Sequence, residues 1–369
     1  PPPPHHVMAR RPRQMCIRHR SKAQIKKKKI NFPSRQTFLE SYKVNHLMDI
    51  TLVYTIIGFG LAGYSVIAND SIQTLGTFIA SKKKWFAWYI LAGSASLVMI
   101  FALAWGWYNY DGDISYGRLT RIPYQEIQWY HAVAPAILLL LTRIGIPVST
   151  TFLVLSAFAS TIVLEKMLVK SIVGYGIAAT VAYICWIVVS KFINEKLDEV
   201  KGDAWISFWR NSVWVTSGWL WWVWLSHDVA NIAVFLPRQL DLTLLLIVMA
   251  YFTALLFYIF YIHGGPIQKV VLEKTGTRYA RSATIINVIY AAVLYYFKEL
   301  NDLPMSTTWV FVGLLCGREL AISTMNKEYK FKYVFPLIGK DFVKMFFGLS
   351  VSVAIVLVIH YFIIPRGLF

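Results

Sequence analysis

Two polar segments embedded in apolar sequence carry the residues best suited to chemistry in this chain. In each segment a carboxylate is followed three positions later by an amide: Asp70 and Gln73, then Asp228 and Asn231. A carboxylate at membrane depth costs roughly 2.5–3.5 kcal/mol to insert, so such residues are retained for a function. Because the same pattern occurs twice, one cause must account for both copies.

A second pair of motifs repeats in the same order. Pro-Val-Ser-Thr-Thr occupies 147–151, and Pro-Met-Ser-Thr-Thr occupies 304–308. Ser149 follows Asp70 by 79 positions, and Ser306 follows Asp228 by 78. Two different motifs at matched spacing indicate an internal duplication.

The Ser-Thr-Thr segments have the composition of an anion site. Proline suits the first turn of a helix, where free N–H groups meet the positive end of the helix dipole. Hydroxyl groups lie beside those N–H groups, and we expect them to face a watery cavity. The alternative is a plain Ser/Thr cap on a turn. The candidate substrate-binding residues are Ser149, Thr150, Thr151, Ser306, Thr307 and Thr308.

Asp70 and Asp228 repel an anion and instead suit Na⁺ or a proton that travels with it. Neighbouring amide oxygens can complete an oxygen shell around such a cation, while the amide N–H₂ groups face the anion. Three further substrate-binding candidates follow: Asn69, Gln73 and Asn231. The two carboxylates are accordingly predicted as coupling-ion residues, with Na⁺ as the candidate metal.

His227 occupies the position in the second copy that corresponds to Asn69 in the first. A histidine can titrate near neutral pH and so take part in proton coupling, and we include it among the coupling-ion residues. A neutral, hydrogen-bonding histidine is the other interpretation. A structural alternative for both acids is pairing with a buried cation, for which Arg143 and Lys298 are candidates.

Composition places the chain in a membrane. Of its 369 residues, 57% are hydrophobic and only 15% are charged, whereas soluble domains carry about 25% charged residues. The net charge of +18 is concentrated at one end, because the first 48 residues hold 12 of the 37 Lys and Arg. We interpret residues 1–47 as a basic tail that is disordered or non-native, and we expect no nucleic-acid partner.

Apolar segment lengths define the predicted architecture, since about 20 residues cross a bilayer. Segments 49–80 and 206–236 are too long or too polar for one straight span, which predicts helices broken at the acidic motifs. Short apolar arms flank each Ser-Thr-Thr motif and predict re-entrant hairpins: 131–142 and 152–164, then 285–297 and 309–317. Continuous spans are predicted at 85–107, 172–192, 242–262 and 345–364.

Each half therefore contains an odd number of crossings, which places the second half upside down relative to the first. The predicted fold is an all-α polytopic membrane protein with two inverted-topology repeats, each with a broken helix and a re-entrant helical hairpin. The first repeat is predicted at 48–200 and the second at 201–369. Inverted repeats are typical of secondary transporters, whose sites lie near the midplane between the repeats.

The duplicated motifs resemble those of the inorganic phosphate transporter (PiT) family, which includes phosphate permeases and related sulfate permeases. The family's Gly-Ala-Asn-Asp-Val-Ala-Asn-Ala motif is similar to 67–73 and 226–231, and its Pro-Val-Ser-Thr-Thr-His motif is similar to 147–152 and 304–309. The resemblance implies a dimeric importer that moves phosphate with Na⁺ or H⁺. The chain departs from the family pattern at Gln73, Phe152, His227 and Trp309.

The expected function is secondary active import of inorganic phosphate, or a similar tetrahedral oxyanion, by symport with Na⁺ or H⁺. We expect no enzymatic activity, no cofactor, a homodimer in the lipid bilayer, and a multi-pass location in a bacterial inner membrane. The alternatives are a sulfate permease of the same family and an oxyanion channel. An intramembrane enzyme is a third, for which Asp111-Gly112-Asp113 would be the metal-binding residues, although the remaining spacing of such a site is missing.

Overall fold

The computed structural model describes residues 35–143, 148–196, 203–265, 268, 279–300, 302–325 and 331–364. The chain divides into two compact units, Pro1–His46 and Leu47–Phe369, and the second unit contains all four duplicated motifs. Residues 1–34 of the basic tail lie outside the described residues, so their predicted disorder stays a prediction, whereas residues 35–47 of the tail are helical.

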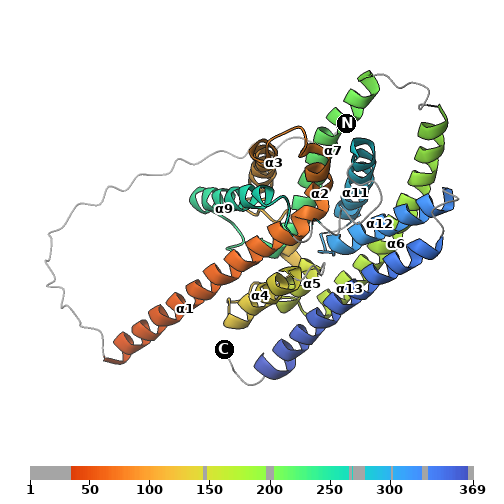
Figure 1. The fold of residues 1–369 in the computed structure, drawn as a ribbon. Helices are drawn as coiled ribbons and strands as arrows, with labels where there is room; N and C mark the ends of the chain where they lie inside the picture. Colours follow the sequence, from red (N-terminus) through yellow and green to blue (C-terminus); the bar gives the residue numbers. More distant parts are fainter. Residues whose placement is uncertain are drawn as a thin grey trace, which may run out of the picture. The chain divides into compact units, whose positions relative to one another are not determined.

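Helices make up most of the described residues, and no strand occurs among them. The main elements, coloured along the chain in Figure 1, are α1 (Arg35–Ser65), η1 (Val66–Asp70), α2 (Ser71–Lys82), α3 (Trp88–Asn109), η2 (Arg118–Arg121), α4 (Trp129–Arg143), α5 (Thr150–Leu153), η3 (Leu155–Ala157), α6 (Thr161–Lys196), α7 (Asp203–Asp228), α8 (Ala230–Ala233), α9 (Leu242–Tyr261), α11 (Ala280–Leu300), α12 (Thr307–Met325), α13 (Phe331–Val358) and η4 (Ile359–Ile363).

Six of the described helical segments are long and apolar enough to cross a membrane. Five of them correspond to predicted spans: Ile50–Lys82, Trp88–Asn109, Thr161–Val189, Leu242–Tyr261 and Lys332–Ile363. The sixth is Ala280–Leu300, which the sequence predicts as a short hairpin arm. Large apolar side chains such as Leu97 and Phe346 are exposed on these helices, as expected for faces that contact lipid. The chain is an all-α, multi-pass integral membrane protein.

The helix predicted to break at the first acidic motif stays continuous. Val66–Asp70 forms a π-helical turn between α1 and α2, and Asp70 lies at its end. A π turn inserts one extra residue into a helix and so disturbs its hydrogen-bond ladder without ending it. The Ser71 hydroxyl donates to the carbonyl of Ile67, which supplies a partner within the disturbed ladder.

The second acidic motif lies at a one-residue irregularity, where Val229 keeps helical dihedral angles and its N–H donates to the carbonyl of Leu225 at 3.1 Å. Helix α7 ends at Asp228, and Val229 separates it from α8, a single turn. Helix α7 is long enough to cross but is not among the six apolar segments; its last turn contains Ser226, His227 and Asp228. The two copies of one sequence pattern therefore adopt different local backbones.

The Ser-Thr-Thr segments begin helices, as predicted, but their arms differ in length. Thr150 opens α5, which has four residues and is followed by the 3-10 turn η3. Thr307 opens α12, which has 19 residues. The prediction that proline lies in the first helical turn is wrong for Pro304, because α12 begins three residues later at Thr307. Pro147 lies outside the described residues, so the prediction is not tested there.

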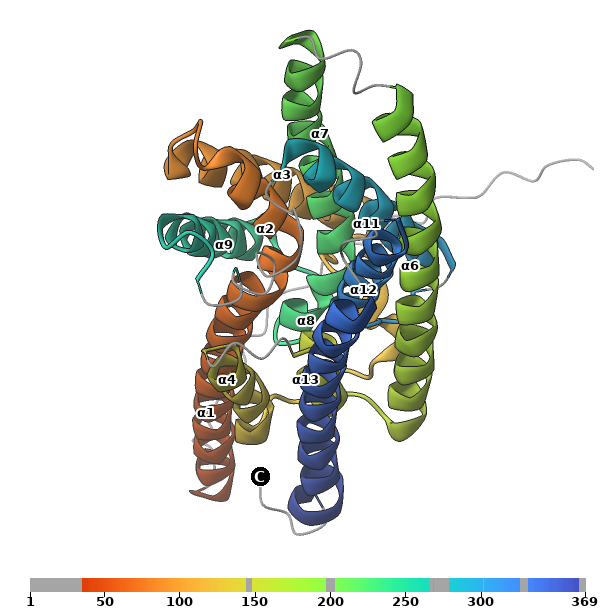
Figure 2. The same ribbon diagram turned by 45° about the vertical axis from the view of Figure 1, so that its right-hand side comes forward.

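Helix α12 packs along α6 over a long interface, and Figures 1 and 2 both show the two helices side by side. Two glycines of α12 make this close approach possible. A Cβ at Gly313 would overlap the carbonyl oxygen of Tyr175, and a Cβ at Gly317 would overlap that of Ala179. Small residues spaced four apart let helix backbones meet in this way within membranes.

Candidate functional site

Asp70 is buried, and both of its carboxylate oxygens accept hydrogen bonds. Oδ1 accepts from the amides of Asn69 at 2.6 Å and Gln73 at 3.1 Å. Oδ2 accepts from the hydroxyl of Thr150, in the first Ser-Thr-Thr segment. The acidic motif of the first half and the threonine that follows it by 80 positions therefore form one polar cluster.

Asp228 has a matching set of partners. Its Oδ1 accepts from the amide of Asn231 at 3.0 Å and from the hydroxyl of Thr151 at 3.4 Å. Its Oδ2 accepts from the hydroxyl of Thr307. In both halves, then, the amide three residues after the acid binds Oδ1, and the first threonine of a helix binds Oδ2.

The two clusters are joined to each other. Thr151, from the first half, contacts Asp228 and also donates to the carbonyl of Met305 at 3.2 Å. Likewise, the amide of Gln73, in the first acidic motif, donates to the hydroxyl of Thr308, in the second Ser-Thr-Thr segment, at 3.1 Å. All four motifs found in the sequence therefore meet at one site.

Ser149 and Ser306 cap their helices. The Ser149 hydroxyl accepts the N–H of Phe152 at 3.3 Å, and the Ser306 hydroxyl accepts the N–H of Trp309 at 3.2 Å. The two serines therefore form helix caps, which was the alternative interpretation of these segments. The side chains that follow them contact each other, because the rings of Phe152 and Trp309 lie 5.5 Å apart at 63°.

Two expectations about the surroundings of these side chains are wrong for this conformation. The hydroxyls do not face a watery cavity: the six Ser-Thr-Thr residues are at most 6% exposed. The amide N–H₂ groups do not face a ligand, because they donate to the two carboxylates. A carboxylate can only accept, so the amide nitrogen must turn toward it.

That orientation leaves the amide oxygens available. Asn69 Oδ1, Gln73 Oε1 and Asn231 Oδ1 are buried and have no hydrogen-bond partner among the described residues. Leaving a buried acceptor unpaired costs about 1–3 kcal/mol, so three in one cluster call for an explanation. Carboxylate and amide oxygens together are the ligands that hard cations prefer.

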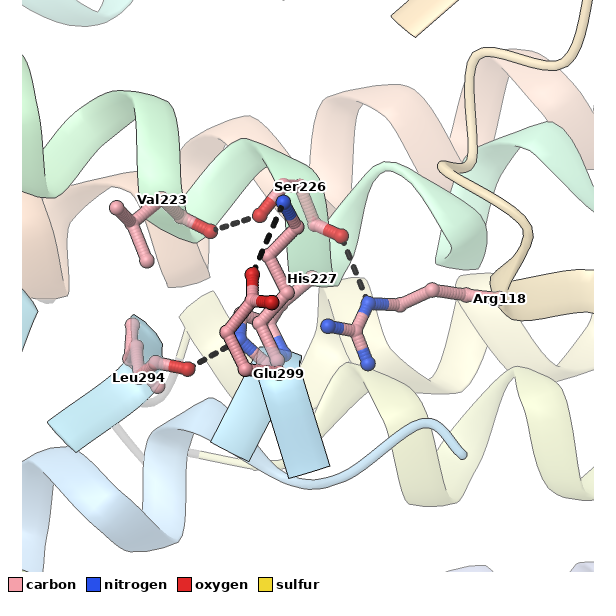
Figure 3. A network of polar contacts seen from close by, with 7 residues as sticks. Arg118, Val223, Ser226, His227, Leu294 and Glu299 are labelled. Atoms are coloured by element: carbon pink, nitrogen blue, oxygen red, sulfur yellow. Dashed lines mark hydrogen bonds and ion pairs between the residues drawn. The ribbon is translucent and has the colours of Figure 1, made fainter. Parts of the chain in front are cut away.

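His227 does not join the carboxylate cluster. Its Nε2 lies 2.8 Å from the carbonyl oxygen of Leu294 (Figure 3), and its Nδ1 is buried without a partner among the described residues. Because a carbonyl only accepts, Nε2 carries the proton. The geometry favours the neutral, hydrogen-bonding interpretation of this histidine.

Arg118 lies beside the second cluster, although the sequence indicates only a loop charge. It is 2% exposed, and its Nε donates to the carbonyl of Ser226 at 2.8 Å (Figure 3). Its Nη1 donates to the carbonyl of Leu303 at 3.5 Å. Burial lowers the pKa of the Arg118 guanidinium to about 10, and the carboxylate of Asp228 has the largest opposing effect. Arg118 therefore remains a cation at neutral pH.

The loop that carries Arg118 is built from the Asp-Gly-Asp sequence. The Asp113 carboxylate accepts the N–H groups of Ser115 at 2.7 Å and Gly117 at 3.0 Å. Gly112 and Gly117 have positive φ angles of 91° and 75°, which favour glycine. Among the described residues no group of three His, Cys, Asp or Glu side chains could hold a metal ion. Asp113 therefore shapes the turn before Arg118.

The cations considered as structural partners of the acids lie elsewhere. Arg143 is exposed, and Lys298 Nζ lies 4.0 Å from Glu299 Oε1. The hydrogen bonds to Asp70 and Asp228 come from hydroxyls and amides, with no Arg or Lys donor among the described residues. A simple ion pair with Arg143 or Lys298 does not explain either carboxylate.

Comparison with known proteins gives one informative result. No protein-family model matches the chain, and no curated protein matches it in sequence. A solved structure of a sodium-dependent phosphate transporter is similar, with a TM-score of 0.54 and 16% sequence identity, over 85% of this chain and 100% of that one. At this identity the similarity shows a shared fold.

Proposed function

We propose that this protein is a secondary active transporter that imports inorganic phosphate, or a similar tetrahedral oxyanion, together with Na⁺ or H⁺. The observation that supports this most directly is the buried cluster in which threonines from both Ser-Thr-Thr segments bind Asp70 and Asp228. The solved transporter of similar fold adds support for phosphate as the substrate class.

Electrostatics explains why an anion and a cation would be carried together. Two like charges about 4 Å apart repel by about 4 kcal/mol at an effective dielectric constant of 20. That energy corresponds to nearly three decades of affinity at about 1.4 kcal/mol per decade. An oxyanion therefore binds poorly beside Asp70 and Asp228 unless a cation or proton first neutralises a carboxylate.

Different groups of the cluster would bind the cation and the oxyanion. The cation would bind the carboxylates and the unpartnered oxygens of Asn69, Gln73 and Asn231. The oxyanion would bind the N–H groups of Thr307 and Thr308 at the start of α12, which have no acceptor within the helix, together with N–H groups of the first Ser-Thr-Thr segment. The Ser and Thr hydroxyls would then exchange their present partners for the anion.

Burial of the whole cluster supports an alternating-access mechanism. Every predicted site residue is at most 6% exposed, so substrate reaches the site only after the surrounding helices move. We infer that the two halves form inverted-topology repeats and that their relative movement opens the site to each side in turn. A permanently open oxyanion channel is harder to reconcile with this burial.

Uptake by purified protein in proteoliposomes tests the proposal. Radiolabelled phosphate is presented with an inward Na⁺ gradient, with an inward proton gradient, and with neither, each with and without excess sulfate. We expect accumulation only with one of the gradients. Uptake that ignores both gradients would indicate the channel, and complete competition by sulfate with sulfate accumulation would indicate the sulfate permease.

A further inference from the structure

The two acidic clusters match in their threonine and amide contacts but differ at one position. In the first cluster, Asn69 donates to Asp70 Oδ1 and adds an unpartnered oxygen. In the second cluster the corresponding residue is His227, which binds the carbonyl of Leu294 instead of Asp228. The second cluster therefore has one amide oxygen fewer with which to surround a cation.

A fixed cation is present only on the side of the second cluster. Arg118 reaches from its loop to the carbonyl of Ser226, two residues before Asp228, and is almost fully buried there (Figure 3). Among the described residues neither Asp70 nor Asp228 receives a hydrogen bond from Lys or Arg, but the charge of Asp228 acts more strongly on the Arg118 guanidinium than that of any other acid, and Asp70 has no resolved effect on it. A buried carboxylate is costly unless a positive charge or hydrogen bonds compensate it. The two acids are compensated in different ways.

We propose that Arg118 is a built-in cation for the Asp228 cluster, so that only the Asp70 cluster takes up a mobile coupling cation. This inference rests on the proposed transport function. The mobile cation would bind Asp70 and the amide oxygens of Asn69 and Gln73. At Asp228 the guanidinium supplies positive charge throughout the transport cycle.

Other charged groups lie near Arg118, but among the described residues none of them hydrogen-bonds the backbone of the second acidic motif. Lys170 Nζ donates to the carbonyl of Leu303 at 2.7 Å, which is the carbonyl that Arg118 also contacts. Lys298 lies beside Glu299, and Asp302 is exposed. Of the described cations, Arg118 is the one that hydrogen-bonds the last turn of α7 next to Asp228.

The alternative is that Arg118 only braces the backbone between Ser226 and Leu303. Cation binding distinguishes the two roles, because a brace changes stability without changing the number of bound cations. The numbers of Na⁺ ions bound and of protons taken up per chain are therefore measured at equilibrium on the full-length protein in detergent. The parental chain, Asp70→Asn, Asp228→Asn, Arg118→Gln and Arg118→Lys are compared.

We expect one bound cation per chain in the parental protein and none in Asp70→Asn. Arg118→Gln should bind a second cation, because Asp228 then lacks its fixed charge, whereas Arg118→Lys should keep the parental number. In proteoliposomes, the cation-to-phosphate ratio at zero net flux should be one higher in Arg118→Gln than in the parental protein.

Two bound cations in the parental chain, one of them lost in Asp228→Asn, would overturn the proposal even if the Arg118 variants fail to fold. An unchanged cation number in folded Arg118→Gln would also overturn it. Failure of the parental chain to accumulate phosphate would instead count against the proposed function, since cation binding is measured without phosphate transport.

Discussion

At the scale of single residues, the site consists of two buried carboxylates, each of which accepts hydrogen bonds from threonine hydroxyls and side-chain amides. Threonine hydroxyls and amide N–H₂ groups donate to Asp70 and Asp228, to each other, and to the carbonyls of Val148 and Met305. This arrangement leaves acceptor oxygens unpaired and no described donor in excess. A positive ion, as proposed for the coupling cation, would satisfy these oxygens.

Replacing Asp70 by Asn should abolish gradient-driven accumulation of phosphate. The substitution keeps the shape of the side chain but removes the charge that attracts a cation, so the protein should remain monodisperse in detergent. Uptake in proteoliposomes under the driving gradient is the measurement. Asp241→Asn is the matched control, because Asp241 caps α9 through Leu244 N–H and Asn caps helices equally well. Parental accumulation in Asp70→Asn would remove this acid from the mechanism.

Thr150→Val and Thr307→Val should weaken apparent affinity for the coupling cation and for phosphate. Each change removes a hydrogen bond to a charged group, worth about 1.5–3 kcal/mol, which corresponds to roughly ten- to a hundredfold in half-saturation. Thr→Ser at either position keeps the hydroxyl and should restore affinity. The half-saturation concentrations for the cation and for phosphate are measured in proteoliposomes.

Ser156→Ala is the control for the threonine variants. Ser156 is buried nearby in η3, but its hydroxyl has no hydrogen-bond partner among the described residues. Its removal should leave both half-saturation values at the parental level. Unchanged values in both valine variants, with a change in Ser156→Ala, would show that the threonines do not hold the site.

The acids, amides and threonines could be found from the sequence because duplication marks them. Two copies of each motif at equal spacing predict that the four segments serve one site, and the hydrogen bonds join them. Arg118 could not be found in this way, because it has no counterpart in the second half and follows an ordinary Asp-Gly-Asp turn. Its position depends on how the loop packs on α7, and no local sequence pattern predicts that packing.

At the scale of elements, helices were predictable from apolar length, but their interruptions were not. Hydropathy indicates that 49–80 is too long for one straight span, whereas the structure has one continuous helical segment, Ile50–Lys82, with a π turn at Val66–Asp70. A π turn and a helix break leave the same apolar pattern, so sequence alone does not separate them. The short α5 likewise could not be distinguished from a full hairpin arm.

Gly317→Ala should destabilise the pair of helices α6 and α12. The added Cβ would overlap the carbonyl oxygen of Ala179, so the helices must separate, and overpacking of this kind typically costs about 1–3 kcal/mol. We expect a lower thermal midpoint in detergent and less monodisperse protein. Thermal unfolding followed by size-exclusion chromatography provides the measurement.

The matched control is Gly176→Ala, on α6 itself. A Cβ at Gly176 meets nothing within 4 Å, and alanine favours a helix by up to about 1 kcal/mol over glycine. Its thermal midpoint should equal or exceed that of the parental chain. Equal midpoints for both variants would mean that the close α6–α12 contact does not contribute to stability.

At the scale of the whole molecule, the site is closed while the helices around it expose apolar faces. The Ser-Thr-Thr segments, the acids and the amides are all buried, yet a transporter must expose them to water on each side of the membrane. Val148 and Met305, which precede the two serines, are each 1% exposed and serve as reporters of that exposure.

Cysteines placed at Val148 and Met305, in a background without native cysteines, should react with impermeant thiol reagents from opposite sides of the membrane. Inverted repeats place the two segments in cavities that open to opposite faces. Labelling should be slow, since both positions are buried, and phosphate with the coupling cation should change its rate. Reaction of both cysteines from the same side only would rule out the inverted arrangement.

The proposed role of Arg118 as a fixed cation would limit how much phosphate a cell could store. Moving one charge through a potential of 100 mV supplies about 2.3 kcal/mol. At about 1.4 kcal/mol per decade, each mobile cation replaced by a fixed one lowers the steepest attainable phosphate gradient roughly fortyfold. In exchange, each phosphate dissipates less of the ion gradient that other transporters share. One loop arginine would thus adjust the balance between scavenging scarce phosphate and conserving energy when phosphate is plentiful.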